Sequence, residues 1–149
     1  MPKKSKDVKY YEAVGRRKES VARVRLYLVT KGSITIKGIK FKGGDVVINN
    51  KPAKQTLAHG YEEKRYMQPL TLTNNADRFA VSIKVMGGGP NGQLEAIILG
   101  ISRALCLVSE EYRPILKAQG LLTRDPRVRE RRKVGTGGKA RRQKQSPKR

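Results

Sequence analysis

A glycine-rich stretch is the part of this sequence that most looks like a chemical site. Residues Gly87–Gly92 match the pattern G-x-G-x-x-G, which in dinucleotide-binding folds leads a pyrophosphate to a helix N-terminus. Such a fold also needs a second parallel strand and an acid about 20 residues downstream. Glu110 and Glu111 fall near that spacing but are expected in the first turn of a helix. Nucleotide binding is therefore disfavoured, and two interpretations stay open: a structural turn, or contact of the glycine backbone with an RNA phosphate.

A second candidate is the basic stretch Gly15-Arg16-Arg17-Lys18, expected to break the chain between two strands. The run that follows, Ser20–Val29, alternates between two faces. One face carries Ala22, Val24, Leu26 and Leu28, and the other carries Arg23, Arg25 and Tyr27. A solvated basic turn is one interpretation. Phosphate contact is favoured, because the next strand has a cationic outer face.

The C-terminal segment holds the densest charge. From Thr123 to Arg149 there are 12 Lys and Arg and two acids, so this segment contributes +10 of the total net charge of +22. It has almost no large aliphatic residues, so burial cannot offset the entropy of ordering it. Guanidinium groups predominate in its first half and suit bidentate phosphate contacts. A solvated surface is the alternative, but this density predicts an extended tail that orders against folded RNA.

Other chemistry is poorly supported. His59 and Cys106 are single residues without a partner at catalytic or metal-ligand spacing, and the acids form no recognisable pair. One cysteine excludes an internal disulfide and a cysteine-based zinc site. We therefore expect no catalytic residue, no metal, no cofactor and no small-molecule substrate. Cys106 is expected to be a small core residue.

The net charge of +22 predicts a polyanionic partner. No segment approaches the roughly 20 apolar residues that span a bilayer, and no signal or transit peptide is apparent, so a cytoplasmic protein without a membrane partner is expected. Aromatic residues are few: two Phe, six Tyr and no Trp. This disfavours a stacking platform for single strands and favours folded RNA, recognised by its shape and backbone.

A folded scaffold must position these candidate binding residues. The chain of 149 residues has the length of one α+β domain. We predict a disordered basic arm over 1–7, a globular domain over 8–122 and the tail over 123–149. The expected strands are 10–14, 20–29, 33–36 with a partner near Phe41, 45–49, 70–72 and 78–86. Pro52 is expected to open a helix to about Tyr66.

The clearest helix follows the glycine stretch. Its apolar stripe runs from Leu94 to Val108 at helical spacing and is expected to pack on the sheet. Ser109 is the expected N-cap of a further helix through Gln119, with Gly120 as its stop.

Several of these segments resemble, in the right order, motifs of the S-nine family of small-subunit ribosomal proteins. The resemblance covers nearly the whole chain from Tyr10. Its motifs are Gly15-Arg16-Arg17-Lys18 with Ala22-Arg23-Val24, Gln68–Thr73 as a central strand, Gly87-Gly88-Gly89 with Gly92-Gln93, Ala96-Ile97, Gly100-Ile101, Arg103-Ala104-Leu105, Leu116–Val128, Glu130–Lys133, Lys139–Arg142 and Lys148-Arg149.

The resemblance implies a ribosomal β-α-β core, with a mixed sheet covered by helices on one face. It implies a structural role in the head of the small ribosomal subunit, among other head proteins, with a tail that reaches the anticodon arm of the peptidyl-site tRNA. The rRNA-binding residues it implies are Arg16, Arg17, Lys18, Arg23, Gly87, Gly88, Gly89, Gln93, Arg103, Arg124, Arg127, Arg129, Arg131, Arg132, Lys133, Lys139, Arg141 and Arg142. Lys148 and Arg149 would contact the tRNA.

Two departures from the family pattern stand out. Residues 31–42 look like an insertion, expected to form a surface hairpin. The chain ends Gln145-Ser146-Pro147-Lys148-Arg149, without the aromatic residue usual before the terminal Ser-Lys-Arg, and Pro147 stiffens the approach. A general nucleic-acid coat, such as a nucleoid protein or RNA chaperone, is the alternative function, but it needs no ordered succession of motifs. An enzyme using the glycine loop would lack half of its site.

Overall fold

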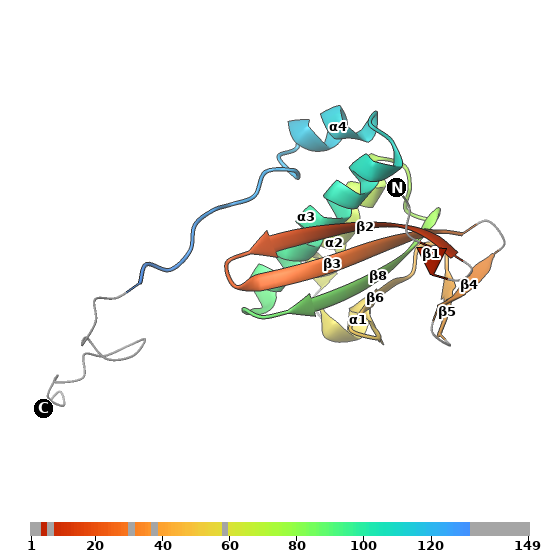
Figure 1. The fold of residues 1–149 in the computed structure, drawn as a ribbon, viewed down its shortest axis with the longest axis horizontal. Helices are drawn as coiled ribbons and strands as arrows, with labels where there is room; N and C mark the ends of the chain where they lie inside the picture. Colours follow the sequence, from red (N-terminus) through yellow and green to blue (C-terminus); the bar gives the residue numbers. More distant parts are fainter. Residues whose placement is uncertain (1–3, 6–7, 30–31, 37–38, 58–59, 132–149) are drawn as a thin grey trace, which may run out of the picture.

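The computed structural model describes residues 4–5, 8–29, 32–36, 39–57 and 60–131. A mixed six-stranded sheet has the order β1-β2-β3-β8-β6-β7, and a separate hairpin pairs β4 with β5 (Figure 1). The strands are β1 Lys4–Ser5, β2 Val8–Arg17, β3 Ser20–Leu28, β4 Ser33–Ile36, β5 Ile39–Lys42, β6 Val46–Ile48, β7 Lys51–Pro52 and β8 Phe79–Met86. The helices are α1 Ala53–Thr56, α2 Gly60–Leu72, α3 Pro90–Val108 and α4 Tyr112–Ala118.

The core lies between one face of the sheet and the helices. As their alternation predicted, Val24 and Leu26 of β3 and Val81 and Ile83 of β8 point into it and are at most 2% exposed. Leu28, predicted on the same face of β3, is instead 38% exposed, because it is the last residue of the strand at the margin of the sheet.

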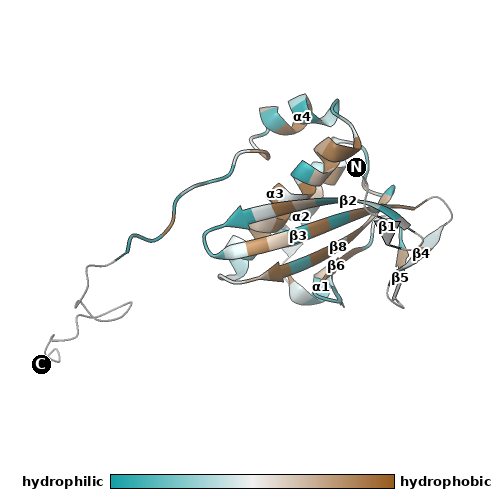
Figure 2. Cartoon of the chain, in the orientation of Figure 1, coloured by the Kyte–Doolittle hydropathy of each residue, from teal (hydrophilic) through white to brown (hydrophobic). Residues whose placement is uncertain are grey.

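Helix α3 is the central helix of the core. Its predicted apolar stripe is buried against the sheet and α2, and α4 packs across its far end (Figures 1 and 2). By length and composition alone α3 could span a membrane, but more than half of it is buried inside the domain. It is the core helix of a folded domain.

The predicted β-α-β core is present. Strand β6 runs parallel to β8, and the connection between them carries α1 and α2. All other strand pairs among the described residues are antiparallel. The sheet is therefore mixed, with its helices on one face, as expected for the α+β fold (Figure 1).

The opposite, outer face of the sheet carries a second small cluster. The predicted hairpin, β4–β5, packs Phe41 onto Tyr10, Tyr27 and Ala80, and all four are at most 7% exposed. Tyr27 was expected on a solvated cationic face. It is buried instead because the hairpin covers this end of the face, so the expected insertion contacts the protein's own sheet.

Two local predictions were wrong. Strand β2 continues through Gly15, Arg16 and Arg17, so the chain turns only at Lys18-Glu19. Residues 70–72 are the last turn of α2, not a strand: Leu70 is buried where the helix packs on the core, and that packing outweighs the β-like run of Leu, Thr and Leu.

The start of α4 and a short segment near the N-terminus also differ from expectation. Glu111 is the N-cap of α4, while Ser109 accepts the Glu111 backbone N–H at 3.3 Å, so Glu110 and Glu111 precede the helix. Within the expected disordered arm, Lys4–Ser5 forms β1, which pairs antiparallel with β2. The other residues of that arm lie outside the described residues, and the domain boundaries stay a prediction.

Candidate nucleic-acid interface

The glycine loop packs tightly on the turn between β2 and β3. Gly87 and Gly88 have φ of 75° and 63°, in the left-handed region. A Cβ on Gly87 would lie 2.5 Å from the Glu19 carbonyl oxygen, and one on Gly88 would collide with the Ser20 hydroxyl. Both positions therefore require glycine, for conformation and for space.

Hydrogen bonds hold the loop in this position. The Ser20 hydroxyl donates to the Gly87 carbonyl at 3.0 Å, and the Gln93 amide donates to the same oxygen at 3.1 Å. Gly89 differs, because a Cβ there would meet nothing within 4 Å. It is the N-cap of α3, and no side chain caps that end of the helix. The structural interpretation thus accounts for Gly87 and Gly88, while Gly89 and the helix end stay open to a ligand.

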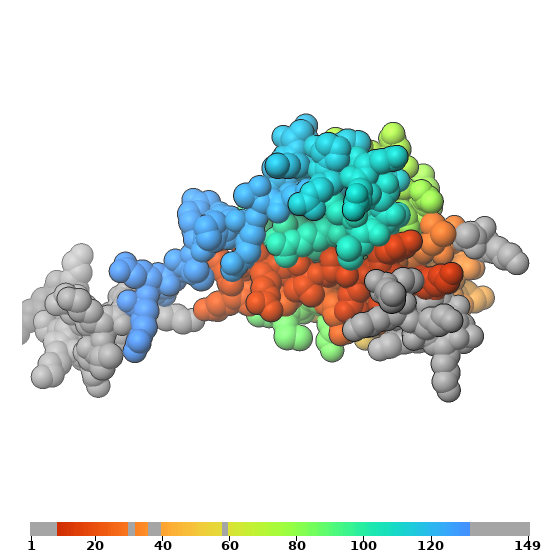
Figure 3. Space-filling model, turned by 45° about the horizontal axis from the view of Figure 1, so that its top comes forward, coloured from red at the N-terminus to blue at the C-terminus, as the bar shows by residue number. Residues whose placement is uncertain are grey.

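The turn, the glycine loop and the start of the tail meet at one end of the domain. They line a hollow of about 340 Å³, bounded by Lys18–Ser20, Gly88–Gly92, Val128 and Arg129. Figure 3 shows the tail residues leaving the domain on this side, beside the first strands. We call this hollow, together with a second one that Arg16 and Arg124 line, the turn–loop–tail surface.

Arg17 anchors the tail to the domain. It is 8% exposed, and its guanidinium bonds Glu95 of α3 at 2.5 Å and Asp125 of the tail at 2.9 Å. It also donates to the Arg127 carbonyl at 2.7 Å. These partners occupy the guanidinium, so Arg17 acts inside the protein, between strand, helix and tail.

Asp125 is the centre of the tail's first turn. Its carboxylate accepts the Arg127 backbone N–H at 2.9 Å and the Arg127 guanidinium at 2.6 Å. The Arg127 side chain and backbone donors, with the nearby charge of Arg17, hold the pKa of Asp125 well below its usual range. The carboxylate is therefore ionised at neutral pH and keeps these contacts.

A second, smaller hollow of about 210 Å³ adjoins this anchor. Arg16, Arg65 and Arg124 line it together with Arg17, Glu95 and Asp125. Arg65 lies on α2 and was not among the predicted site residues. No local motif marks it, since it reaches this group only through the packing of α2 on α3.

Three predicted residues within the described part of the chain lie away from this surface. Arg103 donates to the Val14 carbonyl at 2.9 Å, joining α3 to the edge of β2. Arg23 is exposed on the outer face of the sheet. Arg131 is exposed at the end of the described tail. Arg132, Lys133, Lys139, Arg141, Arg142, Lys148 and Arg149 lie outside the described residues, as does His59.

Reactive groups are scarce in the described part of the chain. Burial raises the pKa of the Cys106 thiol, which is partly buried and packs against the core. Within those same residues, no group of three His, Cys, Asp or Glu side chains could hold a metal ion.

An α+β domain with a basic end and a basic tail defines a class: a protein suited to bind a polyanion such as RNA. Residues 15–149 match the family described as ribosomal protein S9/S16. The chain is 45% identical over 139 residues to the small ribosomal subunit protein uS9 of Mesomycoplasma hyopneumoniae strain 7448, covering 93% of this chain and 95% of that protein. It is 43% identical over 125 residues to the protein of the same name from Mycoplasmopsis synoviae strain 53, covering 84% and 86%. The chain belongs to this ribosomal protein family, as its motifs indicated.

Proposed function

We propose that the protein is a structural constituent of the head of the small ribosomal subunit in the cytoplasm, where it binds ribosomal RNA and neighbouring head proteins. The observation that carries this proposal is the convergence at the turn–loop–tail surface. Three motifs that lie far apart in the sequence meet at one end of the domain. Their exposed cations suit the RNA backbone, and the glycine loop lets a phosphate come close to the main chain.

The cations of the predicted basic turn differ in exposure, and we therefore propose different roles for them. Arg16 and Lys18 are exposed, and we assign them direct phosphate contacts. Arg17 is occupied by Glu95 and Asp125, so its part in RNA binding is to hold the tail. A non-specific coat would need charge but no such internal anchor, and this favours the ribosomal role.

The direct test removes the two exposed charges of the turn. Arg16→Gln with Lys18→Asn keeps the fold, because asparagine tolerates the φ of 52° at position 18. We expect roughly tenfold weaker incorporation into small subunits, since two phosphate contacts are lost. Sucrose-gradient sedimentation of the tagged protein, with high-salt washing, measures this. The control Arg113→Gln with Lys117→Gln removes the same charge from α4. Equal retention of both variants would show the turn to be merely solvated.

The tail has a second proposed role. Lys148 and Arg149 would contact the anticodon arm of the peptidyl-site tRNA, as the family resemblance implies. The described tail supports this in one respect: it is anchored by Asp125 and then runs away from the domain (Figure 1). A segment that starts from a fixed point can deliver its end to a distant partner.

Deleting Pro147–Arg149 tests that role. We expect normal assembly into small subunits, because the anchor and the turn–loop–tail surface are intact. We expect peptidyl-site tRNA to bind several-fold more weakly, since two cationic contacts are lost. Filter binding of tRNA to purified subunits measures this, and a Gln145-to-Ser146 deletion that keeps the terminal cations serves as comparison. Unchanged tRNA affinity after loss of Pro147–Arg149 would exclude a tRNA contact by the terminus.

A further inference from the structure

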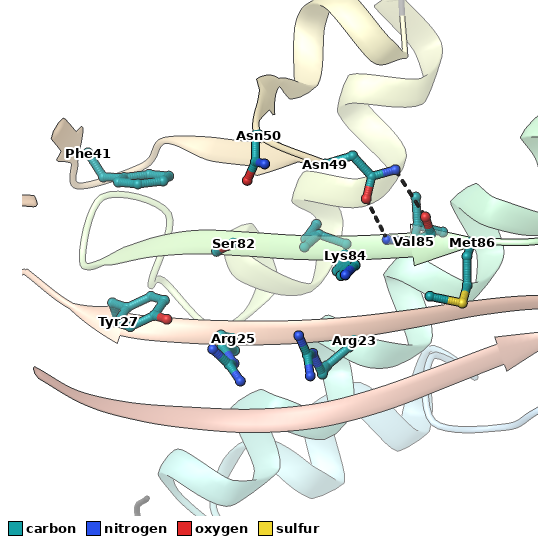
Figure 4. Close-up of a pocket in the computed structure, with 11 residues that line it drawn as sticks. Arg23, Arg25, Tyr27, Phe41, Asn49, Asn50, Ser82, Lys84, Val85 and Met86 are labelled. Atoms are coloured by element: carbon teal, nitrogen blue, oxygen red, sulfur yellow. Dashed lines mark hydrogen bonds between the residues drawn. The ribbon is translucent and has the colours of Figure 1, made fainter. Parts of the chain in front are cut away.

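The outer face of the sheet carries an open hollow away from the turn–loop–tail surface. It has a volume of about 400 Å³ and lies over β3, β8 and the end of β6. The packed helices lie on the other side of the sheet (Figure 1). Tyr27 and Phe41 close one end, and Met86 lies at the other (Figure 4). We call this side of the sheet, opposite the packed helices, the outer face.

Two cations lie at the middle of the outer face. Arg23 of β3 and Lys84 of β8 are directly opposite in the strand register, and both are exposed. Like charges in that position destabilise a sheet. Neither has an ion pair with the described residues, whereas the neighbouring Arg25 is bonded to Glu12 at 2.6 Å and lies over the Tyr10 ring. The fold therefore keeps an unfavourable pair of cations at this place.

The residues around this pair are polar and neutral. Ser82, Asn49 and Asn50 line the hollow, and no Asp or Glu does. Asn49 is fixed by two hydrogen bonds of 3.0 Å, one to the Val85 carbonyl and one from the Val85 N–H (Figure 4). The Asn50 side chain is exposed beside it. The hollow thus offers two positive charges, with an amide and a hydroxyl next to them.

The residues that line the hollow indicate which kind of partner can bind there. The buried centre of a protein–protein interface is depleted of charged residues and enriched in aromatic ones. Here the centre is an Arg–Lys pair, and the aromatic residues Tyr27 and Phe41 lie only at one end and are at most 4% exposed. Phosphate oxygens neutralise such a pair, and amide and hydroxyl groups beside it can bond phosphate and sugar oxygens.

We propose that the outer face docks a second segment of ribosomal RNA backbone, separate from the RNA at the turn–loop–tail surface. The proposal rests on the proposed function. The domain then sits between two RNA segments, one at its basic end and one on the outer face of its sheet. Arg23 and Lys84 contact phosphates there, and the cost of placing them side by side is recovered on binding.

The first test compares two full-length variants of equal charge. Arg23→Gln with Lys84→Gln removes the outer pair, and Arg113→Gln with Lys117→Gln removes two cations from α4. Binding to a transcript of the small-subunit head RNA is measured between low and moderate salt. We expect the outer-face variant to lower the slope of log affinity against log salt by about 2, and the α4 variant to change it little. The free outer-face variant melts at the same or a higher temperature, because the repulsion is gone. Equal slopes for both variants overturn the proposal.

The second test identifies what lies on the outer face in assembled subunits. Ser82→p-azidophenylalanine places a photoreactive group in the hollow, and illumination is expected to join the protein to ribosomal RNA. Crosslinking to a neighbouring protein, or to nothing, overturns the proposal but leaves the proposed function intact. Failure of the unmodified chain to remain in small subunits would refute the proposed function, and this inference with it.

Discussion

Replacing Gly15 with alanine is expected to destabilise the free domain by about 3 kcal/mol or more, the largest effect we predict for a change of one methyl group. Gly15 lies where β2 crosses α3. A Cβ there would overlap the Ala96 carbonyl oxygen and lie 2.6 Å from the Gly100 nitrogen. Both neighbours are main-chain atoms of a buried helix, so no side-chain rotation can relieve the overlap.

The partner glycine on the helix explains why the crossing is so close. A Cβ on Gly100 would lie 2.6 Å from a Val24 methyl group and 3.3 Å from the Gly15 nitrogen. Backbone therefore packs on backbone at this point, and Gly15→Ala must push α3 away from the sheet. That movement opens the core on both sides of the contact.

Urea denaturation followed by circular dichroism measures the effect. The expected fall in the transition midpoint is about 1 M or more, given the slopes usual for small domains. Gly60→Ala is the matched control, because a Cβ at position 60 meets nothing within 4 Å and alanine is favoured in a helix. A midpoint for Gly15→Ala equal to that of the control would mean that strand and helix are not in backbone contact here.

Gly15 also shows what the sequence could and could not predict. A glycine followed by three cations looks like a turn, because glycine and charge are common in turns. Its actual role depends on α3, more than 80 residues away along the chain, and no local pattern contains that information. In contrast, the alternation in β3 and β8 and the stripe of α3 are local periodicities, and they predicted the core correctly.

The same difference between local sequence patterns and contacts made by distant segments applies to the basic surfaces. The G-x-G-x-x-G pattern pointed to the glycine loop, while charge density predicted the basic tail and the basic turn. Charge density could not separate Arg16 from Arg17, which are neighbours of identical type. Only the fold brings Glu95 and Asp125 to Arg17. Arg65 was missed for the same reason, since its place beside Arg124 is set by the packing of one helix on another.

Arg17→Met is the second change for which we expect a large effect, and its signature is release of the tail. Methionine retains the apolar part of the side chain but leaves Glu95, Asp125 and the Arg127 carbonyl without their shared donor. The free energy of unfolding of the domain is expected to fall by about 2 kcal/mol. This is less than for a fully buried ion pair, because water can reach both carboxylates. Freed from its anchor, the chain after Thr123 should sample many directions.

Limited trypsin digestion detects that release. In the free protein, cleavage after Arg124 and Arg127 is expected to be several-fold faster in Arg17→Met than in the unaltered chain, because the protease needs an extended, unbound segment. Arg16→Met is the control, since it removes an exposed neighbouring cation without touching the anchor. Equal cleavage rates in the two variants would contradict the anchoring role.

The pH dependence tests the carboxylate partner of Arg17, Asp125, which Arg127 also bonds. The pKa of Asp125 is held below its usual range in the folded protein, so its contribution is fully present above the ordinary aspartate pKa of about 4 and is lost as the pH falls through the lower, folded value. Tail cleavage by an acid-active protease should therefore rise at low pH in the unaltered chain. In Asp125→Asn it should be fast at every pH, because the residue that titrates is absent. If cleavage in Asp125→Asn still rose as the pH fell, another group would have to hold the tail. A flat profile at the fast rate would identify the Asp125 carboxylate, bonded to Arg127 and Arg17, as the titrating group that holds the start of the tail.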